Sequence, residues 1–134
     1  MASQLKSYQD LLVWQKGIEL VVLAYRATAA FPRSETYGLT SQIRRAATSI
    51  PANIAEGYGR GSRKDYTQFL FIAQGSLKEL ETHFIVAEKL SYLTAAQTEK
   101  LLTQSGELGR MLAGLIRKLR ATSFSTPNTL HPNP

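Results

Sequence analysis

Apolar residues recur every three or four positions along nearly the whole chain, and alternating patterns typical of strands are weak. This spacing places the apolar side chains on one face of an α-helix. Short breaks divide the pattern into four stretches, which predict helices from Asp10 to Ala29, from near Ser34–Tyr37 to Glu56, from Ser62 through Ala87 and from Thr94 through Leu119. Four such helices joined by short loops predict an all-α protein with the fold of an up-and-down four-helix bundle.

The breaks carry residues that begin or end helices. Phe31 precedes Pro32, and a residue before proline resists helical geometry, so the first helix ends there. Gly57 is expected to stop the second helix. Two pairs with the spacing of a capping box begin the third and fourth helices, namely Ser62 with Asp65 and Thr94 with Gln97.

The same periodicity predicts which side chains face the core. The first helix is expected to bury Leu11, Trp14, Ile18, either Val21 or Val22, and Tyr25, and the second Leu39, Ile43, Ala46, Ile50 and either Asn53 or Ile54. The third is expected to bury Tyr66, Leu70, Ala73, Leu77, Leu80, Phe84 and Ala87, and the fourth Leu101, Ser105, Leu108, Leu112, Leu115 and Leu119.

Two helices carry a second apolar stripe beside the first. On the first helix it consists of Val13, Gly17, Leu20, Ala24 and Ala27, and on the fourth of Leu102, Gly106, Gly109, Ala113 and Ile116. A glycine inside a helix costs about 1 kcal/mol relative to alanine, so close approach of another backbone would compensate. The stripes favour a homo-oligomer or a permanent complex. The alternative is a wide buried face within one bundle.

The segment from 49 to 65, SIPANIAEGYGRGSRKD, joins the second and third helices. Pro51 lies inside the second helix, where its missing N–H is expected to bend the helix. Asn53 falls on the inward stripe, where a buried amide needs partners and can fix the register between helices. Glu56 is expected to pair locally.

The chain has 134 residues and no cysteine, which excludes disulfides and thiolate metal sites and favours a cytoplasmic protein. The sequence begins without a basic and apolar signal segment, and no apolar run reaches the roughly 18 residues that a membrane span needs. We predict one bundle domain over residues 8–120 and a disordered tail over residues 121–134, where prolines are frequent.

The formal net charge is +6, which favours anionic partners such as RNA or DNA, or simply keeps the protein soluble. Basic residues gather in three places on the chain. The candidate nucleic-acid-binding residues are Arg44 and Arg45, then Arg60, Arg63 and Lys64, then Arg117, Lys118 and Arg120. Aromatic residues among them are few, so recognition of a single strand by base stacking is only weakly indicated.

The sequence does not contain the residue patterns that are typical of metal sites or nucleotide-binding sites. His83 is the only histidine in a predicted helix, and Leu80 stands where a di-iron bundle would place a glutamate. The stretch GYGRGS fits neither the phosphate-loop nor the dinucleotide-binding pattern. It reads as a helix connection with solvated charges, or as a helix start that attracts an anion. We therefore predict no catalytic residue, no metal, no cofactor and no enzymatic activity.

Several longer stretches carry a family resemblance: YQDLLVWQK, FPRSETYGLTSQIRRAATSIPANIAEGYGR, FLFIAQGSLKELETH and AEKLSYL. Between about Tyr8 and Leu119 the chain resembles the bacterial four-helix-bundle proteins related to those encoded in intervening sequences of 23S ribosomal RNA genes. The resemblance implies a left-handed bundle that assembles into a homopentameric ring. It also implies, as possible partners, RNA or DNA and a reverse transcriptase or other protein, because the related accessory variability determinant of diversity-generating retroelements is a basic pentamer that binds both. The resemblance supplies no catalytic residues.

These observations predict a non-enzymatic oligomeric bundle that serves as a nucleic-acid-associated scaffold or accessory factor without a membrane partner. The alternative is a structural or protein-interaction module whose charge only maintains solubility.

Overall fold

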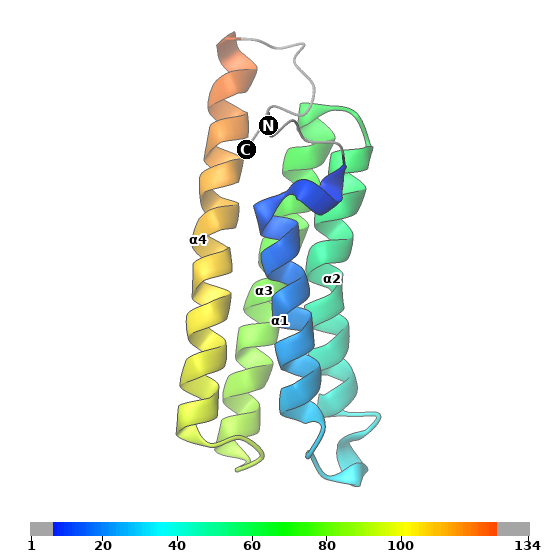
Figure 1. The fold of residues 1–134 in the computed structure, drawn as a ribbon, viewed down its shortest axis with the longest axis vertical. Helices are drawn as coiled ribbons and strands as arrows, with labels where there is room; N and C mark the ends of the chain where they lie inside the picture. The colour runs from blue at the N-terminus through cyan, green and yellow to red at the C-terminus, as the bar shows by residue number, and fades with distance from the viewer. Residues whose placement is uncertain (1–6, 126–134) are drawn as a thin grey trace.

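A computed structural model describes residues 7–125 of the chain, and it consists of four helices that run alternately up and down (Figure 1). The helices are α1 (Leu12–Thr28), α2 (Leu39–Gly59), α3 (Arg63–Lys89) and α4 (Ala95–Ser125). Two short 3₁₀ turns, η1 (Tyr8–Asp10) and η2 (Arg33–Glu35), precede α1 and α2. The described residues contain no strand. The prediction of an all-α four-helix protein is therefore confirmed.

Neighbours in the sequence are neighbours in space. The helices pack in the cyclic order α1, α2, α3, α4 and back to α1, and neither diagonal pair of the described helices is in contact. The absence of contact across the diagonals refers to Cα atoms, none of which come within 8 Å of each other between the described α1 and α3 or α2 and α4. Short connections impose this arrangement on antiparallel helices. None of the described helices is long and apolar enough to cross a membrane.

The predicted caps of α3 and α4 are present. The hydroxyl of Ser62 accepts the backbone N–H of Asp65 at 3.1 Å. Thr94 and Gln97 form a reciprocal box, in which each side-chain oxygen accepts the other residue's backbone N–H, at 3.1 and 2.8 Å. These bonds satisfy N–H groups that have no partner within the helix, so the two helices begin where the sequence predicts.

Gly57 does not end α2, contrary to the sequence prediction. The helix continues to Gly59, and Gly61, with a φ of +87°, supplies the turn. Gly57 is instead buried against α3, because a Cβ at this position would lie 2.6 Å from the Cβ of Phe69. The glycine serves close packing of α2 on α3.

The predicted inward faces of α3 and α4 are buried throughout, and that of α2 is buried with Ile54 in place of Asn53. Of the inward face predicted for the first helix, Leu11 is buried, but most of the rest was predicted wrongly. The buried residues of α1 are Val13, Gly17, Leu20, Ala24 and Thr28, whereas Ile18, Val22 and Tyr25 are exposed.

The reversal of α1 has a packing cause. A Cβ at Gly17 would lie 3.4 Å from the side chain of Pro51, so α1 approaches α2 closely at this point. Small side chains permit that approach, and the larger apolar residues of the opposite stripe turn outward. Apolar content alone could not choose between the two stripes.

Asn53 is half-buried and links α2 to α3 through a relay. Its amide nitrogen donates to the backbone oxygen of Ser49 at 2.8 Å and to the hydroxyl of Ser49 at 3.0 Å. That hydroxyl lies 2.7 Å from the hydroxyl of Ser76 on α3. The predicted role of Asn53 in fixing register is therefore carried partly by two serines.

At the C-terminus, α4 extends to Ser125. Residues 121–125, which the sequence prediction assigns to the tail, are thus helical, and residues 126–134 lie outside the described part of the chain.

Candidate nucleic-acid interface

The three groups of basic residues lie toward two ends of the bundle. The α2–α3 turn and the last turns of α4 are at the same end (Figure 1). Arg44 and Arg45 lie in the second turn of α2, toward the opposite end. The eight candidates therefore do not form one surface.

Arg44 holds two helices together. Its guanidinium carbon lies 4.5 Å from the ring centroid of Tyr25, and its Nε donates to the hydroxyl of Thr28 at 2.9 Å. Both partners are on α1, so Arg44 is engaged within the bundle, whereas Arg45 beside it is exposed. This pair presents one available cation rather than two.

Arg63 is buried, with only 5% of its surface exposed. It is the first residue of α3 and precedes Tyr66 and Leu70 by three and seven positions, on the same inward face. Its guanidinium is therefore not presented to a ligand in solvent. The helical spacing already predicts that Arg63 is buried. Its grouping with the neighbouring Arg60 and Lys64 led instead to the prediction of an exposed site.

Arg60 and Lys64 remain as the exposed cations of the α2–α3 turn. Arg60 pairs with Glu56 at 3.1 Å, as predicted for that glutamate, and its guanidinium carbon lies 5.0 Å from the ring centroid of Phe69. A surface ion pair of this kind contributes about 0 to 1 kcal/mol, so an incoming phosphate can compete with it.

Arg117, Lys118 and Arg120 are exposed near the end of α4. The guanidinium carbon of Arg120 lies 5.3 Å from the ring centroid of Phe71 on α3. With Arg60 and Lys64, these three residues form a set of five exposed cations at one end of the molecule, which we call the basic end.

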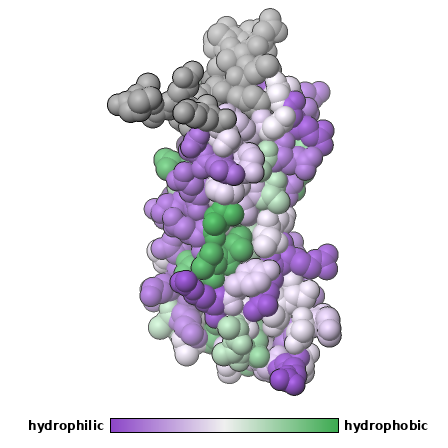
Figure 2. Space-filling model, turned by 45° about the vertical axis from the view of Figure 1, so that its right-hand side comes forward, coloured by the Kyte–Doolittle hydropathy of each residue, from purple (hydrophilic) through white to green (hydrophobic). Residues whose placement is uncertain are grey.

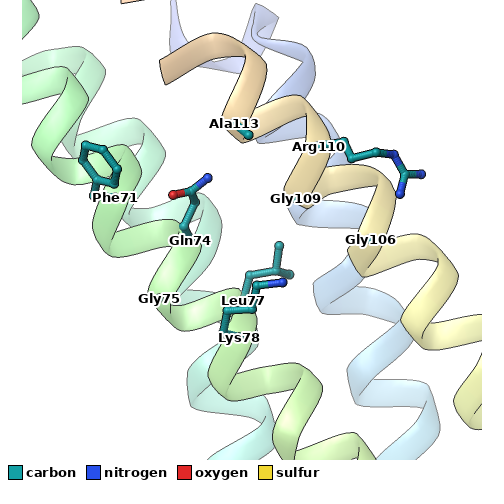
Figure 3. A pocket seen from close by; sticks show the side chains of 9 residues that line it. All are labelled: Phe71, Gln74, Gly75, Leu77, Lys78, Gly106, Gly109, Arg110 and Ala113. Atoms are coloured by element: carbon teal, nitrogen blue, oxygen red, sulfur yellow. The ribbon is translucent and has the colours of Figure 1, made fainter. Parts of the chain in front are cut away.

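A groove runs between α3 and α4 below the basic end (Figure 3). It has a volume of about 590 Å³, and its lining residues are Phe71, Gln74, Gly75, Leu77, Lys78, Gly106, Gly109, Arg110 and Ala113. The sequence indicated its α4 side through the stripe of small residues. The α3 side, with Phe71, Gly75 and Lys78, was not predicted, because the apolar period of α3 indicates only the inward face of that helix.

Several titratable side chains outside these surfaces have structural partners. Tyr92 donates to Glu35 at 3.0 Å, and this hydrogen bond raises the pKa of Tyr92. Glu35 also accepts the backbone N–H of Leu39 at the start of α2. The imidazole of His83 lies 3.4 Å from Glu79. Across residues 7–125, no three His, Cys, Asp or Glu side chains are grouped so that they could hold a metal.

Comparison with known proteins places this geometry in a family. No functionally curated protein matches the chain. Among solved structures, a protein of unknown function from the S23 ribosomal protein family of Bacteroides thetaiotaomicron is 29% identical, with a TM-score of 0.70. The match covers 78% of this chain and 98% of that protein.

A family model described as 23S rRNA-intervening sequence protein matches residues 9–114, which include all of α1, α2 and α3 and most of α4. The match thus covers well over half of the chain, and the four-helix fold agrees with that of the solved structure. The chain belongs to the 23S rRNA-intervening sequence protein family.

Proposed function

We propose that this protein is a non-enzymatic, self-associating bundle of the cytoplasm that binds RNA or DNA through its basic end, as a scaffold or accessory factor. The observation that supports the proposal is the presence of five exposed cations, Arg60, Lys64, Arg117, Lys118 and Arg120, at the end of the bundle where α2 and α4 end and α3 begins. Lysine and arginine side chains bind phosphates and release the counterions condensed on a nucleic acid.

The aromatic residues near the basic end favour contacts with the phosphate backbone over contacts with bases. Tyr58 packs against Tyr66 with a centroid distance of 5.6 Å, and Phe69 and Phe71 lie under Arg60 and Arg120. Each of these rings already contacts a guanidinium or another ring, so fewer ring faces are available for a base to stack on. The proposed binding therefore has weak sequence preference.

Self-association is supported by the outer face of α1, where Leu12, Ile18, Val22 and Tyr25 are exposed. Figure 2 shows an apolar patch on this side of the molecule with hydrophilic side chains around it. The resemblance of the sequence to pentameric relatives suggests a ring of five subunits. Such a ring would carry five times the charge of one chain, about +30, and bind nucleic acid with a steep salt dependence.

Gel shifts with RNA and with duplex DNA at increasing salt test the nucleic-acid proposal. Replacing the five residues of the basic end by alanine should weaken binding at least tenfold. It should also flatten the salt dependence, by about 0.7 to 0.9 in log–log slope for each phosphate that the variant no longer binds. The matched control replaces five exposed cations toward the other end, namely Arg26, Arg33, Arg45, Lys89 and Lys100.

The control removes the same total charge, so an equal loss in both variants would show that net charge, not the basic end, is responsible. The proposal would be overturned if the wild-type protein bound neither RNA nor DNA at a low salt concentration of about 50 mM.

The second candidate function, a protein-interaction module without nucleic-acid binding, is favoured by the same exposed face of α1. Sedimentation of the Ile18→Glu, Val22→Glu variant tests self-association through this face. We expect the wild type to sediment as an oligomer and the variant as a monomer, with a Gln68→Glu control on α3 unchanged. A monomeric wild type would contradict the self-association proposal and leave the gel-shift result to decide the nucleic-acid one.

A further inference from the structure

The groove between α3 and α4 has an apolar floor that continues toward the basic end. Its floor contains Leu77, Ala113 and the backbone at three glycines. A second hollow of about 290 Å³ extends it, lined by Phe71, Gln74, Ala113, Ile116, Arg117 and Arg120. From Gly106 to Arg117 the α4 wall spans about 16 Å, at 1.5 Å per residue, which is the length of three helical turns.

Two of the glycines have no explanation within the described chain. Gly75 and Gly106 do not have the positive φ that only glycine adopts readily. A Cβ at Gly75 would have no neighbouring atom within 4 Å, and one at Gly106 would meet only the end of the Arg110 side chain, at 3.6 Å. Glycine lowers helix stability relative to alanine. The space above these two residues is therefore suited to a closely approaching backbone.

The charged residues that line the groove are all basic. Lys78 and Arg110 border the first hollow, Arg117 and Arg120 border the second, and neither lining includes an acidic residue. Lys78 pairs with Glu81 at 3.4 Å, outside the lining, with 77% of the lysine side chain exposed. A partner that covers this groove must bring negative charge to both sides of an apolar strip.

A second copy of this chain is a poorer match in charge, because it carries 16 Lys and Arg against 10 Asp and Glu. Four of those acids, at 19, 56, 81 and 107, lie within 4 Å of a lysine or arginine of the same chain. The outer face of α1, which is apolar, presents Glu19 together with Lys16 and Arg26. A nucleic acid is also a poor match, because its charged groups would have to cover a floor of leucine, alanine and glycine.

We propose that the α3–α4 groove binds an amphipathic helix of another protein, with small and apolar residues at positions i, i+3, i+4 and i+7 and with Asp or Glu on both flanks. The apolar strip of that helix lies on Gly75, Gly106 and Ala113. Its carboxylates pair with Lys78 and Arg110 at one end of the groove and with Arg117 and Arg120 at the other. This is the helix-in-groove mode of recognition. The proposal does not depend on the nucleic-acid proposal.

A displayed library of 18-residue helical peptides tests this proposal. The apolar strip is fixed as alanine and leucine, and the flanking positions are random. Selection is made on the full-length wild-type protein, with counter-selection on the Gly75→Leu, Gly106→Leu variant, in which the floor is filled. We expect enrichment of Asp and Glu on both flanks.

The binding of a selected peptide is then measured by fluorescence anisotropy. The Gly75→Leu, Gly106→Leu variant and the Lys78→Glu, Arg110→Glu variant should each raise the Kd at least tenfold. The matched control, Arg45→Glu with Lys100→Glu, reverses two exposed charges away from the groove and should leave the Kd unchanged. Circular dichroism checks that each variant retains its helices, and leucine in place of a helical glycine with open space beside it should not lower the melting temperature.

Three outcomes would overturn the proposal. The first is a selection that yields no groove-dependent peptide, or one enriched in lysine and arginine. The second is an oligomer that dissociates when the floor is filled, because the groove would then hold a second copy. The third is a loss of RNA affinity in the floor-filled variant with no peptide bound, because the groove would then be a nucleic-acid surface.

Discussion

The two sides of α3 differ in how closely they are packed. Toward α2 the helices touch at Gly57 and Phe69, and hydrogen bonds run from Asn53 through Ser49 to Ser76. Toward α4 a groove remains, although Ser105 donates to Glu81 across that interface at 2.8 Å. Glycine occurs on both sides with opposite surroundings, crowded at Gly57 and open at Gly75.

The structural role of a helical glycine therefore depends on which atoms surround it. At Gly57 it permits contact within the chain, and that contact stabilises the bundle. At Gly75 it leaves space that nothing in the described chain fills. The first serves packing within the bundle, whereas the second lines the groove that we propose to bind a helix.

Loss of a large side chain should separate the two sides most strongly. Phe84 faces the core with 0% of its surface exposed, and Phe71 at the groove is 43% exposed. Phe84→Ala should cost about 3 to 5 kcal/mol because it leaves a cavity, and Phe71→Ala less than about 1 kcal/mol. Urea unfolding measures both losses of stability. If they were similar, the groove side of α3 would contribute as much to the packed core as the inward side does.

The next effect is expected at Gly57. In Gly57→Ala the new Cβ would lie 2.6 Å from the Cβ of Phe69, so α2 and α3 must move apart. Overpacking of this kind should destabilise the protein by about 2 kcal/mol. Gly59→Ala is the matched control, since a Cβ there meets nothing within 4 Å. If thermal unfolding gave the two variants equal stability, the contact between α2 and α3 would be looser than described.

Tyr66 tests how well the inner face of α3 excludes water. Burial raises the pKa of Tyr66 above its ordinary value of 10. Above pH 10 the unfolded chain therefore loses a proton that the folded chain keeps, and stability falls by about 1.4 kcal/mol per pH unit from this group. The phenol's contribution is fully present below pH 10 and is lost as pH rises toward the raised pKa.

Tyr66→Phe removes this titration with little change in volume. Between pH 10 and pH 11, on the order of one unit of titration, the wild type should lose more stability than the variant. Parallel curves in denaturant titrations would indicate that the phenol ionises freely in the folded state.

The smallest expected effect has the opposite sign. In Gly75→Ala the new Cβ meets no atom within 4 Å, and alanine favours a helix more than glycine does. The substitution should therefore stabilise the isolated protein by about 0.5 to 1 kcal/mol. Differential scanning calorimetry would show a higher melting temperature. A lower melting temperature would mean that Gly75 is already crowded by a neighbour in the free protein, as Gly57 is.

Much of the fold was predictable because its causes are local. The caps at Ser62 and Thr94 and the inward faces of α3 and α4 follow from side-chain chemistry and a period of 3.6 residues. Arg63 could also have been placed by this period, since it shares the face of Tyr66. Within the candidate site, the exposed cations of α4 were predictable in the same way.

Local sequence patterns were thus enough to predict the four helices, most of their ends and the buried faces of three of them, since each depends on residues a few positions apart. The tertiary structure decided which stripe of α1 faces inward, because that choice depends on the fit of Gly17 against Pro51, 34 residues away. It also brought Arg60 and Lys64 to the same end as Arg117 and Arg120, and left α3 and α4 apart at Gly75 and Gly106. Periodicity states which residues can be buried, but shape complementarity between distant segments selects which ones are.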